Sequence, residues 1–257
     1  MKKQHKRYKE RHSTSKMPPH STRLLKSKAY VAFLNRLATY KRDLDLLDIL
    51  SRTKNVLSGV DTRKYTSFSA ISLAEKDVCI YINHFKSTVH EGILKNVYEL
   101  MMLYFRNIIE SVLKHGVDPV RVLGESSEKL ELSTIIKAGS WESLLNELSK
   151  IVLKRLEGLK DTTKLTETLA KRLSISVDAH CLDSAKPYFA IRHLLVHNNG
   201  LPDEDFKKKN SNFIVKGEIE IKYKGVKNAI DAIGKYVQAF DRALITNNVI
   251  AKEDCQG

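Results

Sequence analysis

The sequence predicts a mainly α fold, an up-and-down bundle of helices with a small β-hairpin before the C-terminal helix. Apolar residues recur at three- and four-residue spacing through most of the 257 residues, as one face of a helix requires. Residues 213–223 instead alternate in the manner of a hairpin around Gly217. The helical segments are short and closely connected, which is typical of a bundle.

The N-terminal part is predicted to hold an arm and a helical extension. Residues 1–22 are rich in Lys, Arg, His and Ser and lack apolar side chains to bury, so we expect a disordered basic arm. A helical pattern follows, and we expect a helical N-terminal extension over 23–59 that Ser58-Gly59 ends. The helical domain itself is expected to span 60–257.

The first half of that domain is predicted to contain a connector over 60–68 and helices over 70–84 and 91–114. We expect the carboxylates of Glu99 and Glu110 to be solvated. The helix over 91–114 is the clearest in the chain, because its apolar residues form one broad stripe: Ile93, Leu94, Val97, Leu100, Met101, Tyr104, Ile108, Ile109 and Val112.

Shorter helices are predicted beyond Gly116 and Pro119, which end the long helix. They cover 131–138, 141–157 and 165–173. A loop over 174–181 and a further helix come next.

That further helix carries the unusual polar residues of the chain. Asp183 or Ser184 is expected to cap its start, with Pro187 in the first turn, where a missing N–H is tolerated. Asn199-Gly200 fits a left-handed cap at its end. The remaining predicted segments are a polar loop over 203–212 and a closing helix over 226–249.

Positive charge is concentrated at the N-terminus. Residues 1–28 contain ten Lys or Arg and one acid, whereas the rest of the chain has 34 basic and 29 acidic residues. A free basic arm neutralises phosphates and releases counterions, which favours a nucleic-acid partner. A solubilising tail without a dedicated partner is the alternative.

The cysteines and the apolar runs indicate the compartment. Cys79, Cys181 and Cys255 are widely spaced and form no C-x-x-C pair, which argues against a disulfide framework or a zinc ribbon. No apolar run reaches the length of a membrane span, and no apolar core follows the basic N-terminus as in a secretory signal. We therefore expect a soluble, cytoplasmic protein. Neither a P-loop nor a dinucleotide fingerprint is present, and no cofactor is predicted.

Arg192, His193, His197 and Asn198 are the candidate catalytic residues, because they gather in the last turns of an otherwise apolar helix. The two histidines are about 40° apart around the helix axis and one turn apart along it. Arg192 and His197 diverge by about 140°. Either the arginine side chain curls round, or two helices cooperate across an interface.

Other interpretations of these residues remain open. In the first of them, Arg192 pairs with a carboxylate and both histidines interact with the helix C-terminus, where cations are favoured. In the second, His193 and His197 bind a metal as an H-x3-H pair. A zinc metalloprotease has Glu directly after the first histidine, but Leu194 stands there and no third ligand is evident. No metal site is therefore predicted.

The run from Arg192 to His197 resembles the Arg-x4–6-His signature of HEPN-domain ribonucleases. With Asn198-Asn199-Gly200 after it, the run looks especially like the HEPN branch of prokaryotic defence and toxin proteins linked to RiboL-PSP. The acidic-aromatic stretch Asp203-Glu204-Asp205-Phe206 is also similar to that branch.

This resemblance is close over 160–250, looser over 65–115 and absent over 1–60. It implies a homodimeric helical bundle in which two motif helices face each other, so that a composite cleft collects Arg192 and His197 from both protomers. It further implies metal-independent RNA cleavage, in which a ribose 2′-OH attacks the adjacent phosphate. The products are a 2′,3′-cyclic phosphate and a 5′-OH end.

The resemblance also implies roles for the four residues. His197 is the general base or acid, which suits a side chain that titrates near neutrality. Arg192 holds the phosphate and offsets charge that develops in the transition state. His193 orients the phosphate or exchanges protons with it, and Asn198 donates a hydrogen bond to it.

We therefore expect an HEPN endoribonuclease, a toxin or anti-phage effector that acts with an antitoxin or an activating partner. The alternative is a catalytically silent HEPN module that binds RNA, nucleotide or a partner protein. A third hypothesis is that residues 1–60 form a docking arm for a partner subunit. Some HEPN toxins carry a tyrosine two residues beyond the histidine, which a nucleotidyltransferase antitoxin modifies. Asn199 stands there and Tyr188 is no obvious substitute, so the resemblance gives that route of control no support.

Overall fold

A computed structural model of the chain describes residues 25–53, 61, 64–65, 75–124, 131–159 and 161–256. The fold is the predicted one, a mainly α bundle with a small β-hairpin before the last long helix. Within the described residues, every helix is too short or too polar to cross a bilayer. The predicted basic arm over 1–22 lies outside the described residues.

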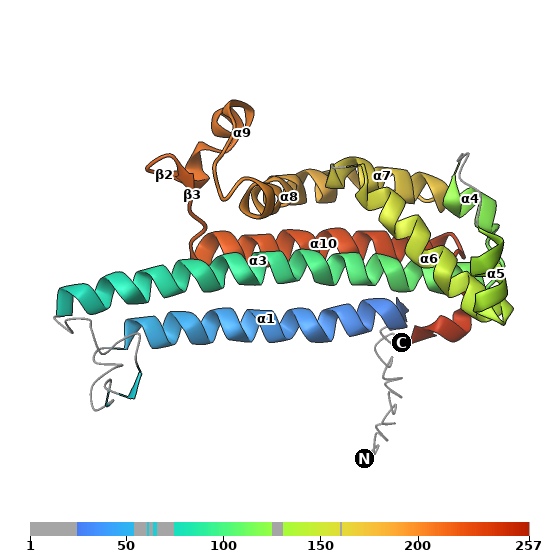
Figure 1. Cartoon of the computed structure of the whole chain (residues 1–257), viewed down its shortest axis with the longest axis horizontal. Coiled ribbons are helices and arrows are strands. Elements are labelled where there is room, and N and C mark those ends of the chain that lie inside the picture. The colour runs from blue at the N-terminus through green and yellow to red at the C-terminus, as the bar shows by residue number, and fades with distance from the viewer. Residues whose placement is uncertain are drawn as a thin grey trace, which may run out of the picture.

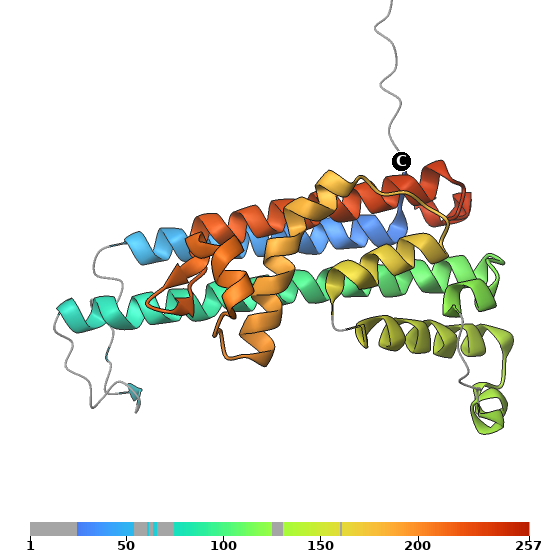
Figure 2. The same cartoon turned by 90° about the horizontal axis from the view of Figure 1, so that it is seen from above.

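Three long helices form the body of the bundle (Figure 1). They are α1 (Lys28–Arg52), α3 (Glu75–Lys114) and α10 (Tyr223–Thr246), and each packs against the other two. A fourth helix, α8 (Ala179–His197), crosses over α3 and α10, as Figure 2 shows. The C-terminal end of α8 therefore comes to lie beside α3.

Shorter elements complete the fold. The helices α4 (Pro119–Leu123), α5 (Leu132–Ala138), α6 (Trp141–Glu157) and α7 (Thr162–Arg172) lead from the end of α3 to α8, and α9 (Glu204–Lys209) follows α8. The strands β2 (Ile214–Val215) and β3 (Glu218–Ile219) form an antiparallel hairpin, in which Ile214 is paired with Ile219. A second sheet pairs β1 (Lys26–Ser27) with β4 (Cys255–Gln256).

Aromatic side chains fill the core where the three long helices meet. Phe105 of α3 and Phe240 of α10 stand edge to face, with ring centroids 5.0 Å apart, and Tyr104 lies 6.1 Å from Phe33 of α1. All four are nearly inaccessible to solvent. Because α1 contributes to this core, burial of its apolar stripe is coupled to that of α3 and α10. The predicted domain boundary at residue 59 falls outside the described residues and stays a prediction.

One continuous helix, α3, replaces the two helices predicted over 70–84 and 91–114. The intervening residues contain neither proline nor glycine, so nothing in the backbone forces a break. His90, in this segment, is buried, and its Nδ1–H donates to the carbonyl of Ile221, 3.1 Å away. Burial lowers the pKa of His90. The prediction of a break was wrong because this tertiary contact anchors the segment.

The start of α8 was also predicted wrongly. The helix begins at Ala179, inside the predicted loop over 174–181, and Asp178 caps it by accepting a hydrogen bond from the N–H of His180. Asp183 therefore lies within the helix, and Pro187 lies in its interior instead of its first turn. Proline at that position leaves one carbonyl of the preceding turn without its helical N–H partner.

Two further segments are more ordered than predicted. Pro119 begins α4, with Asp118 as its cap, and does not simply end the preceding helix. The predicted polar loop over 203–212 instead holds α9, capped by Asp203, and a short 3-10 turn. Both helix starts could have been predicted from the sequence, because an acid directly before a helical segment caps its free N–H groups.

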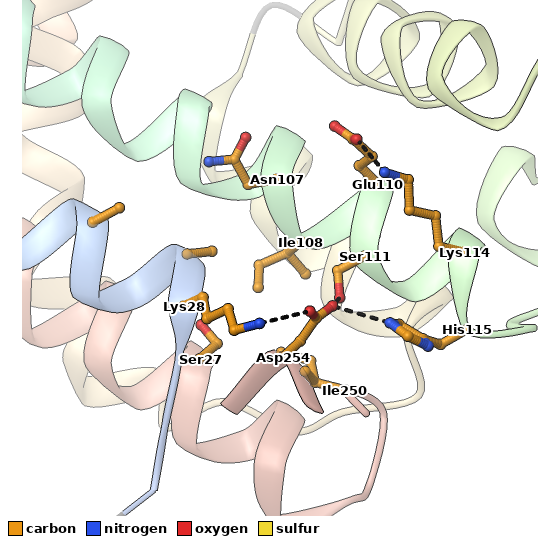
Figure 3. A pocket seen from close by; sticks show the side chains of 12 residues that line it. Ser27, Lys28, Asn107, Ile108, Glu110, Ser111, Lys114, His115, Ile250 and Asp254 are labelled. Atoms are coloured by element: carbon orange, nitrogen blue, oxygen red, sulfur yellow. Dashed lines mark hydrogen bonds and ion pairs between the residues drawn. The ribbon is translucent and has the colours of Figure 1, made fainter. Parts of the chain in front are cut away.

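Near the C-terminus, the carboxylate of Asp254 contacts residues at the start of α1 and at the end of α3, and we call this set of contacts the clasp (Figure 3). Asp254 accepts a hydrogen bond of 2.5 Å from Ser111 of α3, and its carboxylate lies 3.1 Å from Nε2 of His115 and 3.8 Å from the amine of Lys28. The Ser111 hydrogen bond, with the positive charges of His115 and Lys28, lowers the pKa of Asp254. The strand pair of β1 and β4 was not predicted.

Candidate functional site

The motif helix α8 ends as the sequence predicts. Asn198 is its C-cap, and its N–H donates to the carbonyl of Leu194. Asn199 and Gly200 both have positive φ, 50° and 76°, and the N–H of Gly200 also bonds to Leu194. A left-handed turn of this kind satisfies the last carbonyls of a helix. This turn fixes the position of the C-terminal end of α8.

The guanidinium of Arg192 is held against α3. Its Cζ lies 4.2 Å from the ring centroid of Tyr98, and one terminal nitrogen donates to Oε1 of Glu99 at 2.7 Å. Nε is buried without a hydrogen-bond partner among the described residues. The arginine side chain therefore bends away from the helix axis towards a neighbouring helix. Arg192 thus pairs with a carboxylate, as in the first of the other interpretations of these residues.

Tyr98 is itself fixed in place. Its hydroxyl lies 3.2 Å from Oγ1 of Thr162, the first residue of α7, and its ring meets Phe189 edge to face. Only 7% of the residue is exposed, and this burial raises the pKa of its phenol. The aromatic ring under Arg192 is thus a neutral, rigid support, which suits a cation–π contact.

The two histidines lie next to each other on the exposed side of α8. The ring centroids of His193 and His197 are 4.7 Å apart, as expected for residues one turn apart. Both side chains are exposed, so both reach solvent and any bound ligand.

Arg192, His193 and His197 line one cleft of about 620 Å³, which we call the motif cleft. Tyr98 and Glu99 of α3 form another side of it, and Glu157 and Leu165 border it from α6 and α7. A single chain therefore brings the arginine and both histidines to one cavity, despite the divergence of Arg192 and His197 on the helix. Asn198 is not among the lining residues and serves instead as the helix cap.

The sequence did not identify Tyr98 or Glu99 as partners of Arg192. Glu99 was expected to be solvated, and 61% of its side chain is indeed exposed. The only sequence signal is that a tyrosine and an acid are adjacent on the clearest helix. Pairing them with Arg192 requires knowledge of how α8 crosses α3.

A second cluster combines Ser111, His115 and Asp254, the residue types of a nucleophilic triad, beside a cavity of about 400 Å³ (Figure 3). Its connectivity is wrong for that chemistry. Serine and histidine both bond to the carboxylate, whereas an activated serine donates to the histidine. This cluster is better described as the clasp of the C-terminus. Across the described ranges, no group of three or more His, Cys, Asp or Glu is arranged to hold a metal ion.

Glu99→Gln tests how the arginine is held. We expect the free energy of unfolding to change by less than about 1 kcal/mol, because an ion pair with a largely exposed partner contributes little. The affinity for inorganic phosphate should rise, since the carboxylate no longer competes with that anion for Arg192. Chemical denaturation and binding titration measure the two effects. Glu110→Gln, which removes an ion pair of the same helix with Lys114, is the matched control. Unchanged or weaker phosphate binding by Glu99→Gln would contradict this view of the pair.

Comparison of the chain with protein-family models, with curated proteins and with solved structures found no match.

Proposed function

We propose that the chain is a metal-independent endoribonuclease of the HEPN type, with its active site shared between two copies. The observation that carries this proposal is the motif cleft, where Arg192, His193 and His197 line one cavity. A cation beside two exposed imidazoles supplies what phosphodiester transfer without a metal needs, namely charge stabilisation and proton exchange.

The chemistry follows from these groups. His197 takes the proton of a ribose 2′-OH, and the 2′-oxygen attacks the adjacent phosphorus. The bond from phosphorus to the 5′-oxygen breaks, and that oxygen receives a proton from an imidazolium, for which His193 is the nearest candidate. Arg192 turns from Glu99 to the phosphate and offsets the charge of the transition state. The products are a 2′,3′-cyclic phosphate and a 5′-OH end.

The surroundings of the cleft support a shared site. Apolar side chains are exposed at this end of α8, with Val196 42% and Leu201 56% accessible. Leu103, one turn beyond Glu99 on α3, is 49% exposed. A second copy that covers these side chains would bring its own motif helix to the cleft and exclude water from it.

A toxin or defence role, with an antitoxin or an activating partner, forms part of this proposal. Its support is the Arg192–Glu99 ion pair, because an arginine engaged by a carboxylate is not available to phosphate until that contact opens. The ten basic residues among the first 28 supply charge for RNA binding or for docking to a partner.

One observation favours a second function, a module that binds RNA, nucleotide or a partner without cleavage. Arg192 is engaged by both Tyr98 and Glu99, so it also serves to tie α8 to α3. In that case the same residues build a polar seam between helices or protomers.

The deciding experiment combines the full-length protein with end-labelled RNA in the presence of EDTA. We expect cleavage that leaves 2′,3′-cyclic phosphate and 5′-OH ends, and no such ends with His197→Ala. RNA that is bound but stays intact would favour the binding module. Cleavage that requires an added metal ion, or that leaves 3′-OH ends, would contradict the proposed chemistry.

A further inference from the structure

A second cleft, of about 300 Å³, adjoins the motif cleft on the side of α9, and we call it the α9 cleft. The two cavities share three lining residues, Asp161, Thr162 and His193. They therefore adjoin each other, with His193 lining both, and we call the two clefts together the groove.

One face of α8 forms a wall of this groove. Lys186, Ala190, His193 and His197 follow one another at spacings of four, three and four residues, so they line a single stripe of the helix. The stripe extends about 16 Å along the helix axis, longer than a single nucleotide requires. Two histidines and Lys186, whose amine also pairs with Asp183 at 2.7 Å, give this side of the groove hydrogen-bond donors for phosphates.

The α9 side of the groove has a different character. Asp205, Lys209 and Asn210, in and directly after α9, line it, and the buried rings of Phe189 and Phe206 form the apolar floor. Asp203 is engaged as the cap of α9, whereas Asp205 has no hydrogen-bond or ion-pair partner within the part of the chain that the structure describes. A free carboxylate over an apolar floor accepts hydrogen bonds from amino groups of a base.

We propose that the α9 cleft binds the nucleotide next to the scissile phosphate, so that single-stranded RNA runs along α8 through both clefts. This inference rests on the proposed function for its position beside the cut. Lys209 contacts a phosphate, while Asp205 and Asn210 accept from the exocyclic amino group of the base. Cytidine, adenosine and guanosine carry such a group and uridine does not, so the cleft selects against uridine. A duplex engages these amino groups in base pairs, so the cleft selects single strands.

The test measures equilibrium binding of fluorescent oligoribonucleotides to the full-length His197→Ala protein, which does not depend on cleavage. We expect oligo(C) to bind about tenfold more tightly than oligo(U), and a duplex to bind more weakly than oligo(C). Asp205→Asn should remove most of the preference for oligo(C), and Glu204→Gln, its neighbour outside the cleft, should keep it. Lys209→Ala should reduce the slope of log affinity against log salt by about 0.7, the effect of one phosphate contact on a single strand. Lys208→Ala is the control for that slope.

The outcomes separate the two proposals. Equal binding of oligo(C) and oligo(U), or groove variants that behave as their controls do, overturns the α9 cleft as a nucleotide site, even if the wild-type protein cleaves RNA. The expected pattern of binding by a protein that never cleaves RNA supports the cleft and refutes the nuclease. Thermal unfolding of each variant confirms that it is folded.

Discussion

We expect His197→Ala and Arg192→Ala each to lower the rate of the proposed RNA cleavage by about 10²–10⁴-fold, the range for loss of a general acid–base or of a group that stabilises transition-state charge. The reason is geometric. His197 is the exposed imidazole at the end of α8, and Arg192 is the cation that its cleft contains. Single-turnover cleavage of end-labelled RNA measures the effect. His180→Ala, an exposed histidine at the other end of α8, and Arg121→Ala on α4 are matched controls and should keep full activity.

The same two variants test whether the site is shared. A mixed dimer, with Arg192→Ala in one protomer and His197→Ala in its partner, regains activity if a site draws arginine from one chain and histidine from the other. It stays inactive if each chain supplies both. Co-expression with two different tags and sequential purification isolates the mixed species, and native mass spectrometry verifies its composition. A wild-type protein that cleaves RNA as a monomer would refute the shared site outright.

The sequence predicted local features of the fold well, because neighbouring residues determine them. The Asn199-Gly200 pair takes the predicted left-handed turn that ends α8. Ser140 and Asp161, whose side chains are suited to capping, cap α6 and α7. The hairpin turns at Lys216 and Gly217, both at positive φ, where a glycine permits that conformation without strain. Each of these depends on a few adjacent residues.

Contacts between distant segments could not be predicted from the sequence. Arg192 and Glu99 are 93 positions apart, and nothing in either segment specifies that α8 crosses α3 at Tyr98. For the same reason the sequence could not decide between an arginine side chain that curls round to His197 and a site shared by two helices. A flat projection of the helix places them about 140° apart, and only the bent arginine side chain and the walls of α3 and α7 bring them to one cleft.

The errors at helix starts have a different cause. Asp178, Asp183 and Ser184 are all good capping residues, so local preference alone does not choose among them. The earlier start buries Leu182 in the core, and that burial favours Asp178 despite the cost of Pro187 in the helix interior. Tertiary packing decided the boundary.

Asp241→Ala should destabilise the fold by about 3 kcal/mol or more, the largest stability effect that we expect of a polar substitution. Asp241 of α10 is 1% exposed and accepts three hydrogen bonds, from the N–H and hydroxyl of Ser27 and from the hydroxyl of Tyr104. Each buried donor that loses its acceptor costs about 1–3 kcal/mol. Urea denaturation measures the change. Asp231→Ala, which breaks an exposed ion pair of the same helix with Lys41, should cost less than about 1 kcal/mol. Equal effects of the two substitutions would contradict this role.

The buried carboxyl also predicts how stability depends on pH. Burial raises the pKa of Asp241, although the bonds from Ser27 and Tyr104 oppose the shift. The folded state therefore retains the proton at pH values where the unfolded chain has released it, so the unfolding free energy contributed by this group decreases as pH rises from about 3.8 through the raised pKa. Asp241→Asn does not titrate and lacks this term. The difference in stability between wild type and Asp241→Asn should accordingly shift against the wild type as pH rises through that window. A difference that is independent of pH would show that Asp241 has an ordinary pKa in the fold.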